Sequence, residues 1–124
     1  MSTHHLTRCE LEIMNVVWDR GRVTVQDVVD ALERPLAYTT VMTMLNILYR
    51  KRVVARCGKR GRAYVYKPLV SREQVRRSMT SELTDALFDG SVKSLVLSLI
   101  DGKSLSRSDV EELKKAIESV EAQS

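Results

Sequence analysis

The sequence predicts a mainly α-helical fold with one small β-hairpin, and three observations predict it. Several stretches of the 124-residue chain carry apolar residues at helical spacing. Four helix starts are marked by Ser or Thr followed three residues later by an acidic residue or Gln, the pattern of a capping box. Between residues 53 and 66 the pattern changes to β-branched and aromatic residues around glycines, which is typical of two paired strands.

The first two helices are predicted over about residues 7–20 and from Thr24 to just before Pro35. The capping pair Thr7 and Glu10 opens the first of them. Each helix carries one apolar stripe, so each is expected to bury a single face against a common core.

A third helix is predicted from Tyr38 to Arg52, with Val41, Leu45 and Leu48 on its apolar side. The opposite side displays polar residues at spacings of four, three and four, namely Thr39, Thr43, Asn46 and Arg50. This helix therefore has a face that packs and a face that is free to contact a partner.

A β-hairpin is predicted next, with strands at residues 53–57 and 63–66 and a basic, glycine-containing loop at residues 58–62. Pro68 is expected to end the second strand. An isolated two-stranded hairpin is only marginally stable, so this one is expected to pack against the helices.

Three further helices are predicted in residues 71–124, separated by turns at Asp89-Gly90-Ser91 and Asp101-Gly102-Lys103. About fifty residues bury little core by themselves, so their apolar stripes need a partner, for which a second copy of the chain is favoured. The alternative is that they fold back onto the first seventy residues. The candidate dimerisation residues are Leu83, Leu87, Leu95, Val96, Leu99, Leu113 and Ile117.

The charge is unevenly distributed along a chain whose net charge is +4. Residues 1–70 carry 12 Lys and Arg against 6 Asp and Glu, whereas residues 71–124 carry 8 against 10. No acidic residue occurs between Glu33 and Glu73, while the interval 34–72 contains ten basic residues. Such a stretch attracts a polyanion, although a solvated basic face is the plainer alternative.

The order of three helices followed by a basic hairpin is that of a winged helix-turn-helix in residues 1–70, followed by a helical dimerisation segment in residues 71–124. In that fold the third helix enters the major groove and the hairpin reaches phosphates or the minor groove of double-stranded DNA. The candidate DNA-binding residues are Tyr38, Thr39, Thr40, Thr43, Asn46, Arg50, Lys51, Lys59, Arg60 and Arg62. Asn46 is suited to pair with adenine, and Ile47 either touches a thymine methyl group or packs under the hairpin.

Two other classes of function stay open at this point: a protein-interaction adaptor built on the same scaffold, and a ligand- or redox-gated regulator. Cys57, next to the basic loop, is either redox-sensitive or an inert, half-buried thiol. No catalytic arrangement, metal site or cofactor motif stands out, so an enzyme is not expected. With no membrane-spanning run and no signal peptide, a cytoplasmic protein without a membrane partner is expected.

Motifs along nearly the whole chain resemble one family of transcriptional regulators, the penicillinase and methicillin-resistance repressors (BlaI/MecI). The motifs are Leu36 to Leu45 with Leu48 to Lys51, Glu10 to Met14 with Trp18, Ala63 to Tyr66, Ser94 to Leu97, Leu105-Ser106, and Glu111 to Leu113. The resemblance implies a homodimeric repressor that binds palindromic operators, often of β-lactamase genes, and is released when a sensor-protease pathway leads to its cleavage.

The chain departs from this family at two positions that bear on function. Family members commonly have Arg, which suits guanine, where this chain has Ile47, so the operator sequence does not carry over. At the cleavage point, typically Asn before Phe, this chain has Ser98-Leu99. Release by the family's cleavage route therefore does not carry over directly, and Ser98-Leu99 is the candidate point if a regulatory protease acts on this chain.

Overall fold

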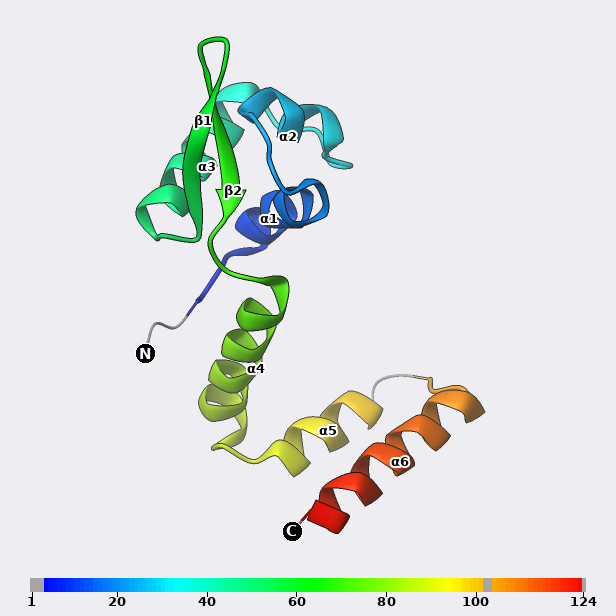
Figure 1. The fold of residues 1–124 in the computed structure, drawn as a ribbon. Coiled ribbons are helices and arrows are strands. Elements are labelled where there is room, and N and C mark those ends of the chain that lie inside the picture. The colour runs from blue at the N-terminus through cyan, green and yellow to red at the C-terminus, as the bar shows by residue number, and fades with distance from the viewer. Residues whose placement is uncertain (1–3, 102–103, 124) are drawn as a thin grey trace. The chain divides into compact units, whose positions relative to one another are not determined.

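The computed structural model describes residues 4–101 and 104–123. It confirms a mainly α-helical fold with one antiparallel hairpin (Figure 1). The chain divides into two compact units, Met1–Glu82 and Leu83–Ser124, and helix α4 (Arg72–Phe88) contributes to both. The boundary between the two compact units, after Glu82, lies later in the chain than residue 70, the point at which the net charge changes sign. The functional division into residues 1–70 and 71–124 stays a prediction.

The first unit contains, in order, α1 (Arg8–Arg20), α2 (Val25–Ala31), α3 (Tyr38–Arg50), β1 (Val54–Arg60) and β2 (Ala63–Pro68). The capping boxes expected from the sequence are formed: the side chains of Thr7 and Thr24 accept hydrogen bonds from the backbone N–H groups three residues on. The same reciprocal bonds open α4 at Ser71 and α6 at Ser106. These starts are local in sequence, which is why they could be predicted.

The core of the first unit is formed by the apolar stripes of its helices together with the base of the hairpin. Its buried members are Leu6, Ile13, Met14, Val17, Val23, Val25, Val28, Val41, Leu45, Leu48, Val53, Val54, Tyr66 and Val75. Val75 lies in the first turns of α4, and Met79 packs against the same core. The first part of α4 therefore belongs to this unit because it completes the unit's core.

The hairpin is anchored to the helices by its second strand. The backbone N–H of Val23 donates to the carbonyl of Tyr66 at 3.0 Å, and the N–H of Tyr66 donates to the carbonyl of Val23 at 2.7 Å. These bonds link β2 to the segment between α1 and α2, so the hairpin leans on the helices as the sequence predicts.

The loop predicted at residues 58–62 is wrong in its length, because Gly58, Lys59 and Arg60 continue strand β1. Gly61 and Arg62 alone form the turn, with Gly61 at φ +65°, the arrangement expected of a two-residue hairpin with glycine first. Gly58, at φ +147°, lies where the strand register shifts. The bulge absorbs one residue and lets the strands pair to the tip.

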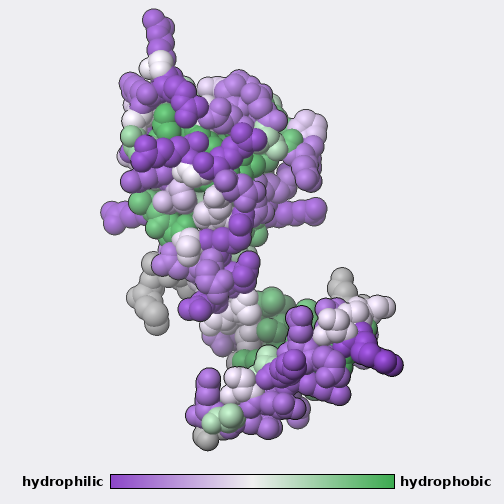
Figure 2. Space-filling model, turned by 45° about the vertical axis from the view of Figure 1, so that its right-hand side comes forward, coloured by the Kyte–Doolittle hydropathy of each residue, from purple (hydrophilic) through white to green (hydrophobic). Residues whose placement is uncertain are grey.

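The second unit contains the end of α4, α5 (Val92–Asp101) and α6 (Arg107–Gln123). Of the turn predicted at Asp101-Gly102-Lys103, the last two residues lie outside the described residues. Many large apolar side chains of this unit are exposed, and Figure 2 shows green hydrophobic surface among its purple hydrophilic side chains. Within residues 4–101 and 104–123, no helix combines the length and the hydrophobicity that crossing a membrane requires.

A buried carboxylate joins α1 to the end of α3. Both oxygens of Glu10 accept hydrogen bonds from Lys51 Nζ, at 3.0 and 2.9 Å, and the Glu10 side chain is only 2% exposed. Burial alone raises the pKa of this carboxyl, but the hydrogen bonds from Lys51 and Thr7 outweigh burial and hold the pKa below its ordinary value of 4.5. The pair therefore favours the charged, folded form at neutral pH.

Glu10→Gln is expected to lower the free energy of unfolding at pH 7 by about 2 kcal/mol, because a charge-assisted hydrogen-bond pair is lost. A carboxyl with a lowered folded-state pKa stabilises the fold above its unfolded-state pKa and loses that contribution as the pH falls through the folded-state pKa. The stability of the unmodified protein should consequently decrease more steeply below about pH 4.5 than that of Glu10→Gln.

Urea titrations at a series of pH values measure this difference. Glu73→Gln is the matched control, since Glu73 is an exposed carboxylate that pairs only with Arg76 and Arg77 of its own helix among the described ion pairs. If the unmodified protein and Glu10→Gln lose stability equally as the pH falls, the stabilising role assigned to the Glu10 carboxylate is contradicted.

Candidate nucleic-acid interface

Helix α3 presents one polar face outside the core. Val41, Leu45 and Leu48 are fully buried, and this fixes the rotation of the helix about its axis. Tyr38, Thr39, Thr40, Thr43 and Arg50 are exposed as a consequence, whereas Asn46 is half-buried. The N-cap residue of α3 is Ala37, whose side chain makes no capping hydrogen bond to the first-turn N–H groups.

Lys51, predicted at the exit of the same helix, is exposed and already has an acidic partner. It caps the C-terminus of α3, and its ammonium group is held on the carboxylate of Glu10. The next residue, Arg52, adopts φ +63° and is exposed. The end of α3 therefore offers Arg50 and Arg52 as exposed cations, together with Lys51, which is paired with Glu10 of α1.

The hairpin carries the predicted cations Lys59, Arg60 and Arg62, all of them exposed. Arg60 Nη1 donates to Asp27 Oδ2 of α2 at 2.9 Å, so the far end of β1 is tied to the second helix. The pKa of the Asp27 carboxyl is lowered, first by the backbone N–H of Thr24 and also by Arg60. Lys59 Nζ lies 4.9 Å from the ring centroid of Tyr64, within cation–π distance.

Arg56 connects the hairpin to α3 and was not among the predicted site residues. Its guanidinium carbon lies 4.2 Å from the ring centroids of both Tyr49 of α3 and Tyr64 of β2. Its Nη2 donates to Asn46 Oδ1 at 3.1 Å. A strand arginine flanked by tyrosines two residues apart on the partner strand was the available signal, and the contact places the Asn46 edge of α3 beside the hairpin.

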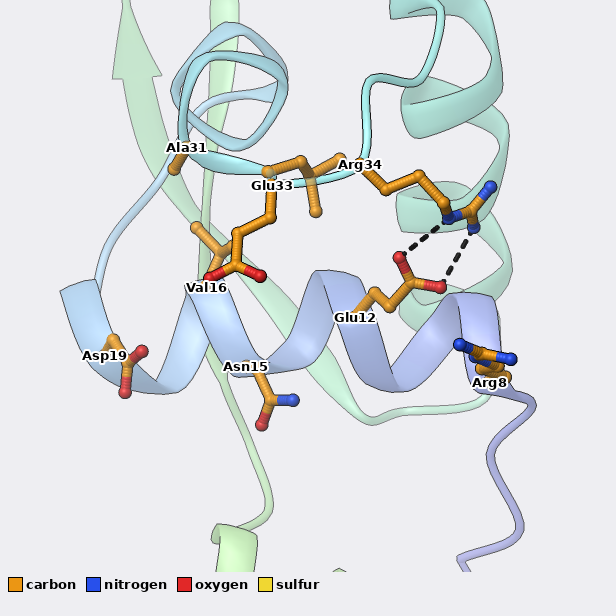
Figure 3. Close-up of a pocket in the computed structure, with 9 residues that line it drawn as sticks. Arg8, Glu12, Asn15, Val16, Asp19, Ala31, Glu33 and Arg34 are labelled. Atoms are coloured by element: carbon orange, nitrogen blue, oxygen red, sulfur yellow. Dashed lines mark hydrogen bonds and ion pairs between the residues drawn. The ribbon is translucent and has the colours of Figure 1, made fainter.

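A hollow lies elsewhere on the first unit, between α1 and the residues that follow α2. It has a volume of about 470 Å³ and an apolar floor that includes Val16 and Leu32. Figure 3 shows Glu12 and Arg34 joined across it, and Arg34 Nε and Nη2 donate to the two Glu12 oxygens at 3.0 and 2.9 Å. The bond from Arg34 lowers the pKa of Glu12, and this pair fixes the segment that leads into α3.

The cysteines and the acidic groups do not assemble a metal site in the described part of the chain. Cys9 and Cys57 are both free and half-buried. The thiol of Cys57 donates to the carbonyl of Val65 at 3.6 Å across the hairpin, so it takes part in the strand pairing.

The candidate dimerisation residues separate into an inner and an outer group. Leu95 is buried and Val96 is half-buried within the single chain. The other five are exposed, namely Leu83, Leu87, Leu99, Leu113 and Ile117. Ser98 and Leu99, the candidate cleavage point, both lie within α5 and are exposed.

Three helices followed by a two-stranded hairpin, with a polar outer face on the third helix, define a winged-helix protein. The family model described as Penicillinase repressor matches residues 6–119. The chain belongs to this family, whose members are DNA-binding transcriptional repressors and not enzymes, in agreement with the sequence-based prediction.

Relatives and solved structures agree with this family. The methicillin resistance regulatory protein MecI of Mammaliicoccus sciuri is 23% identical over 117 residues, covering 93% of this chain and 94% of the relative. The penicillinase repressor of Bacillus licheniformis is 25% identical over 115 residues, 91% of this chain and 89% of the relative. The structure of Bacillus licheniformis BlaI in monomeric form with the blaP half-operator is 25% identical with a TM-score of 0.50, covering 59% of this chain and 90% of that one.

Proposed function

We propose that this chain is a homodimeric repressor that binds palindromic operator DNA, with α3 in the major groove and the hairpin on the phosphate backbone or in the minor groove. One observation carries the proposal: the polar face of α3 adjoins the basic hairpin through the hydrogen bond from Arg56 to Asn46. A helix fits a major groove about 12 Å wide, and the hairpin then lies beside the neighbouring phosphates.

The proposed DNA contacts are Tyr38, Thr39, Thr40, Thr43, Asn46, Arg50, Lys51, Lys59, Arg60 and Arg62. Lys51 is paired with Glu10 in the free chain. Threonine hydroxyls and the Asn46 amide suit base edges or phosphates, and the arginines suit phosphates. The half-operator complex of monomeric BlaI supports the idea that one such winged unit serves one half-site. Arg60 has to exchange Asp27 for a phosphate, so its net contribution is expected to be smaller than that of Arg62.

The exposed apolar residues of the second unit support a second copy of the chain as the partner. Leu87 is 70% exposed and Ile117 is 57% exposed, on helices whose other faces are polar. Several large apolar side chains exposed on one unit favour an interaction site, and a twofold partner matches a palindrome. Two linked half-site contacts add through effective concentration, so operator binding should need the dimer.

Arg50→Ala and Arg62→Ala are expected to weaken duplex binding several-fold at about 0.1 M salt on specific and random DNA alike. Each lost phosphate contact should also reduce the slope of log affinity against log salt by about 0.9. Fluorescence anisotropy over a range of salt concentrations measures both quantities.

Lys115→Ala is the matched control, because it removes one exposed positive charge from α6, outside the winged unit. An equal loss of affinity in this variant would mean that net charge alone governs binding. That result would contradict the proposed DNA interface on α3 and the hairpin.

Ile117→Glu is expected to convert the protein into a monomer, because it places a charge in the proposed apolar interface. Sedimentation velocity at micromolar concentration should detect the change, and affinity for a full palindrome should fall to that for one half-site. Ser119→Glu adds the same charge on a different side of α6 and should stay dimeric. A dimer that persists in Ile117→Glu would contradict this interface.

A further inference from the structure

The side chain of Arg56 occupies an unusual position between the hairpin and α3. Its guanidinium carbon lies over the rings of both Tyr49 and Tyr64, 4.2 Å from each centroid, with the centroid of Tyr66 at 5.8 Å. These contacts restrict the position of the guanidinium group, since cation–π contacts favour a cation over the ring face. The direction of its N–H groups is consequently restricted as well.

This arrangement fixes the orientation of the Asn46 amide. A guanidinium group has only donors, so the amide atom that faces Arg56 Nη2 at 3.1 Å has to be the oxygen Oδ1. The NH₂ group of Asn46 is then the group left to approach a ligand, and it can only donate. A fixed positive charge beside Oδ1 also disfavours the approach of a second donor to that oxygen.

The consequence concerns which base Asn46 can select. Bidentate recognition of adenine needs the amide oxygen to accept from N6 and the NH₂ group to donate to N7. Guanine presents two acceptors, O6 and N7, in the major groove. An amide held as a donor can donate to either acceptor of guanine but only to N7 of adenine, whose N6 needs an acceptor, so guanine is the better match.

We propose that Arg56 is a specificity-determining positioning residue, which holds Asn46 as a donor and thereby directs it to guanine in place of adenine. The inference rests on the proposed function, because it requires α3 to lie in the major groove. It revises the expectation that Asn46 pairs with adenine.

The position of Arg56 between the tyrosines has a cost in free energy. Within the described part of the chain, its Nε is buried and makes no hydrogen bond. An unpartnered buried donor is destabilising, and an apolar side chain of similar length could fill the space between the tyrosines without that cost. The cation–π contacts with the tyrosines have to offset this cost.

The test is a selection of bound duplexes from a random pool, read by sequencing, with the full-length chain and its Arg56→Met variant. Methionine keeps an unbranched stem between the tyrosines and removes the donors and the charge. The base pair that Asn46 contacts is the one at which Asn46→Ala loses its sequence preference. At this base pair the unmodified protein should prefer guanine. In Arg56→Met the ratio of adenine to guanine should rise by about tenfold, within the range of one bidentate contact.

Two matched variants separate this mechanism from general effects. Lys67→Met removes an exposed charge from β2 and should leave the base preference unchanged. In an Asn46→Ala background, Arg56→Met should no longer shift the preference, because the group that it orients is absent. If Arg56→Met does not fold, Arg56→Lys carries the same prediction with a smaller shift, since lysine lacks the planar donors.

An unchanged base preference in a variant that still binds duplex DNA would overturn the inference and leave the proposed function standing. A uniform loss of affinity across all sequences would also overturn it, since that is the behaviour of a phosphate or packing contact. Failure of the unmodified protein to bind any duplex would instead overturn the proposed function itself.

Discussion

The carboxylate of Glu10 is the contact on which the geometry of the winged unit depends. One of its oxygens accepts the N–H of Thr7 at 2.9 Å and closes the capping box of α1, while both oxygens hold Lys51 at the end of α3. The start of the first helix and the end of the third are thereby fixed to each other. Directly after Lys51 the chain reverses through Arg52 and enters β1, so the position of the hairpin also follows from this pair.

Ion pairs between distant residues also neutralise part of the basic stretch at residues 34–72. In the sequence, residues 34–72 contain no acidic residue, yet in the described structure four of the ten cations pair with acids of α1 and α2. These pairs are Arg34 with Glu12, Lys51 with Glu10, Arg60 with Asp27, and Arg72 with Asp19. The cations outside these four pairs include Arg50 and Arg52 at the end of α3 and Lys59 and Arg62 on the hairpin, so fewer positive charges are available to a polyanion than the composition suggests.

The features that the sequence predicts well are those decided by neighbours along the chain. Capping boxes, the apolar stripes of the helices and the end of β2 at Pro68 depend on residues three or four positions apart. The length of the hairpin loop was mispredicted because a register shift near Gly58 is a property of two strands and not of one. The fold class could be derived because the order of elements alone limits the possible architectures.

The site was predictable only in part, for the same reason. The outward rotation of Thr39, Thr43 and Arg50 follows from helical periodicity, and it could be read from the chain. The engagement of Lys51 by Glu10, 41 positions away, and of Arg60 by Asp27, 33 positions away, could not. Arg56 was missed because its importance arises from side chains on two other elements.

Besides the backbone bonds between Val23 and Tyr66, two side-chain links join the hairpin to α2 and α3. Arg56 holds the hairpin to Asn46 of α3, and Arg60 holds its tip to Asp27 of α2. The backbone bonds and the buried residues fix the base of the hairpin, Arg60 adds a contact near its tip, and Arg56 fixes the Asn46 amide. With both links, the donors of α3 and the cations of the hairpin are oriented before a duplex arrives, which lowers the entropy that binding has to remove. In the proposed complex, a phosphate that draws Arg60 away from Asp27 releases that contact only after the duplex has bound, so the tip of the hairpin adapts to the backbone while the Asn46 amide stays fixed.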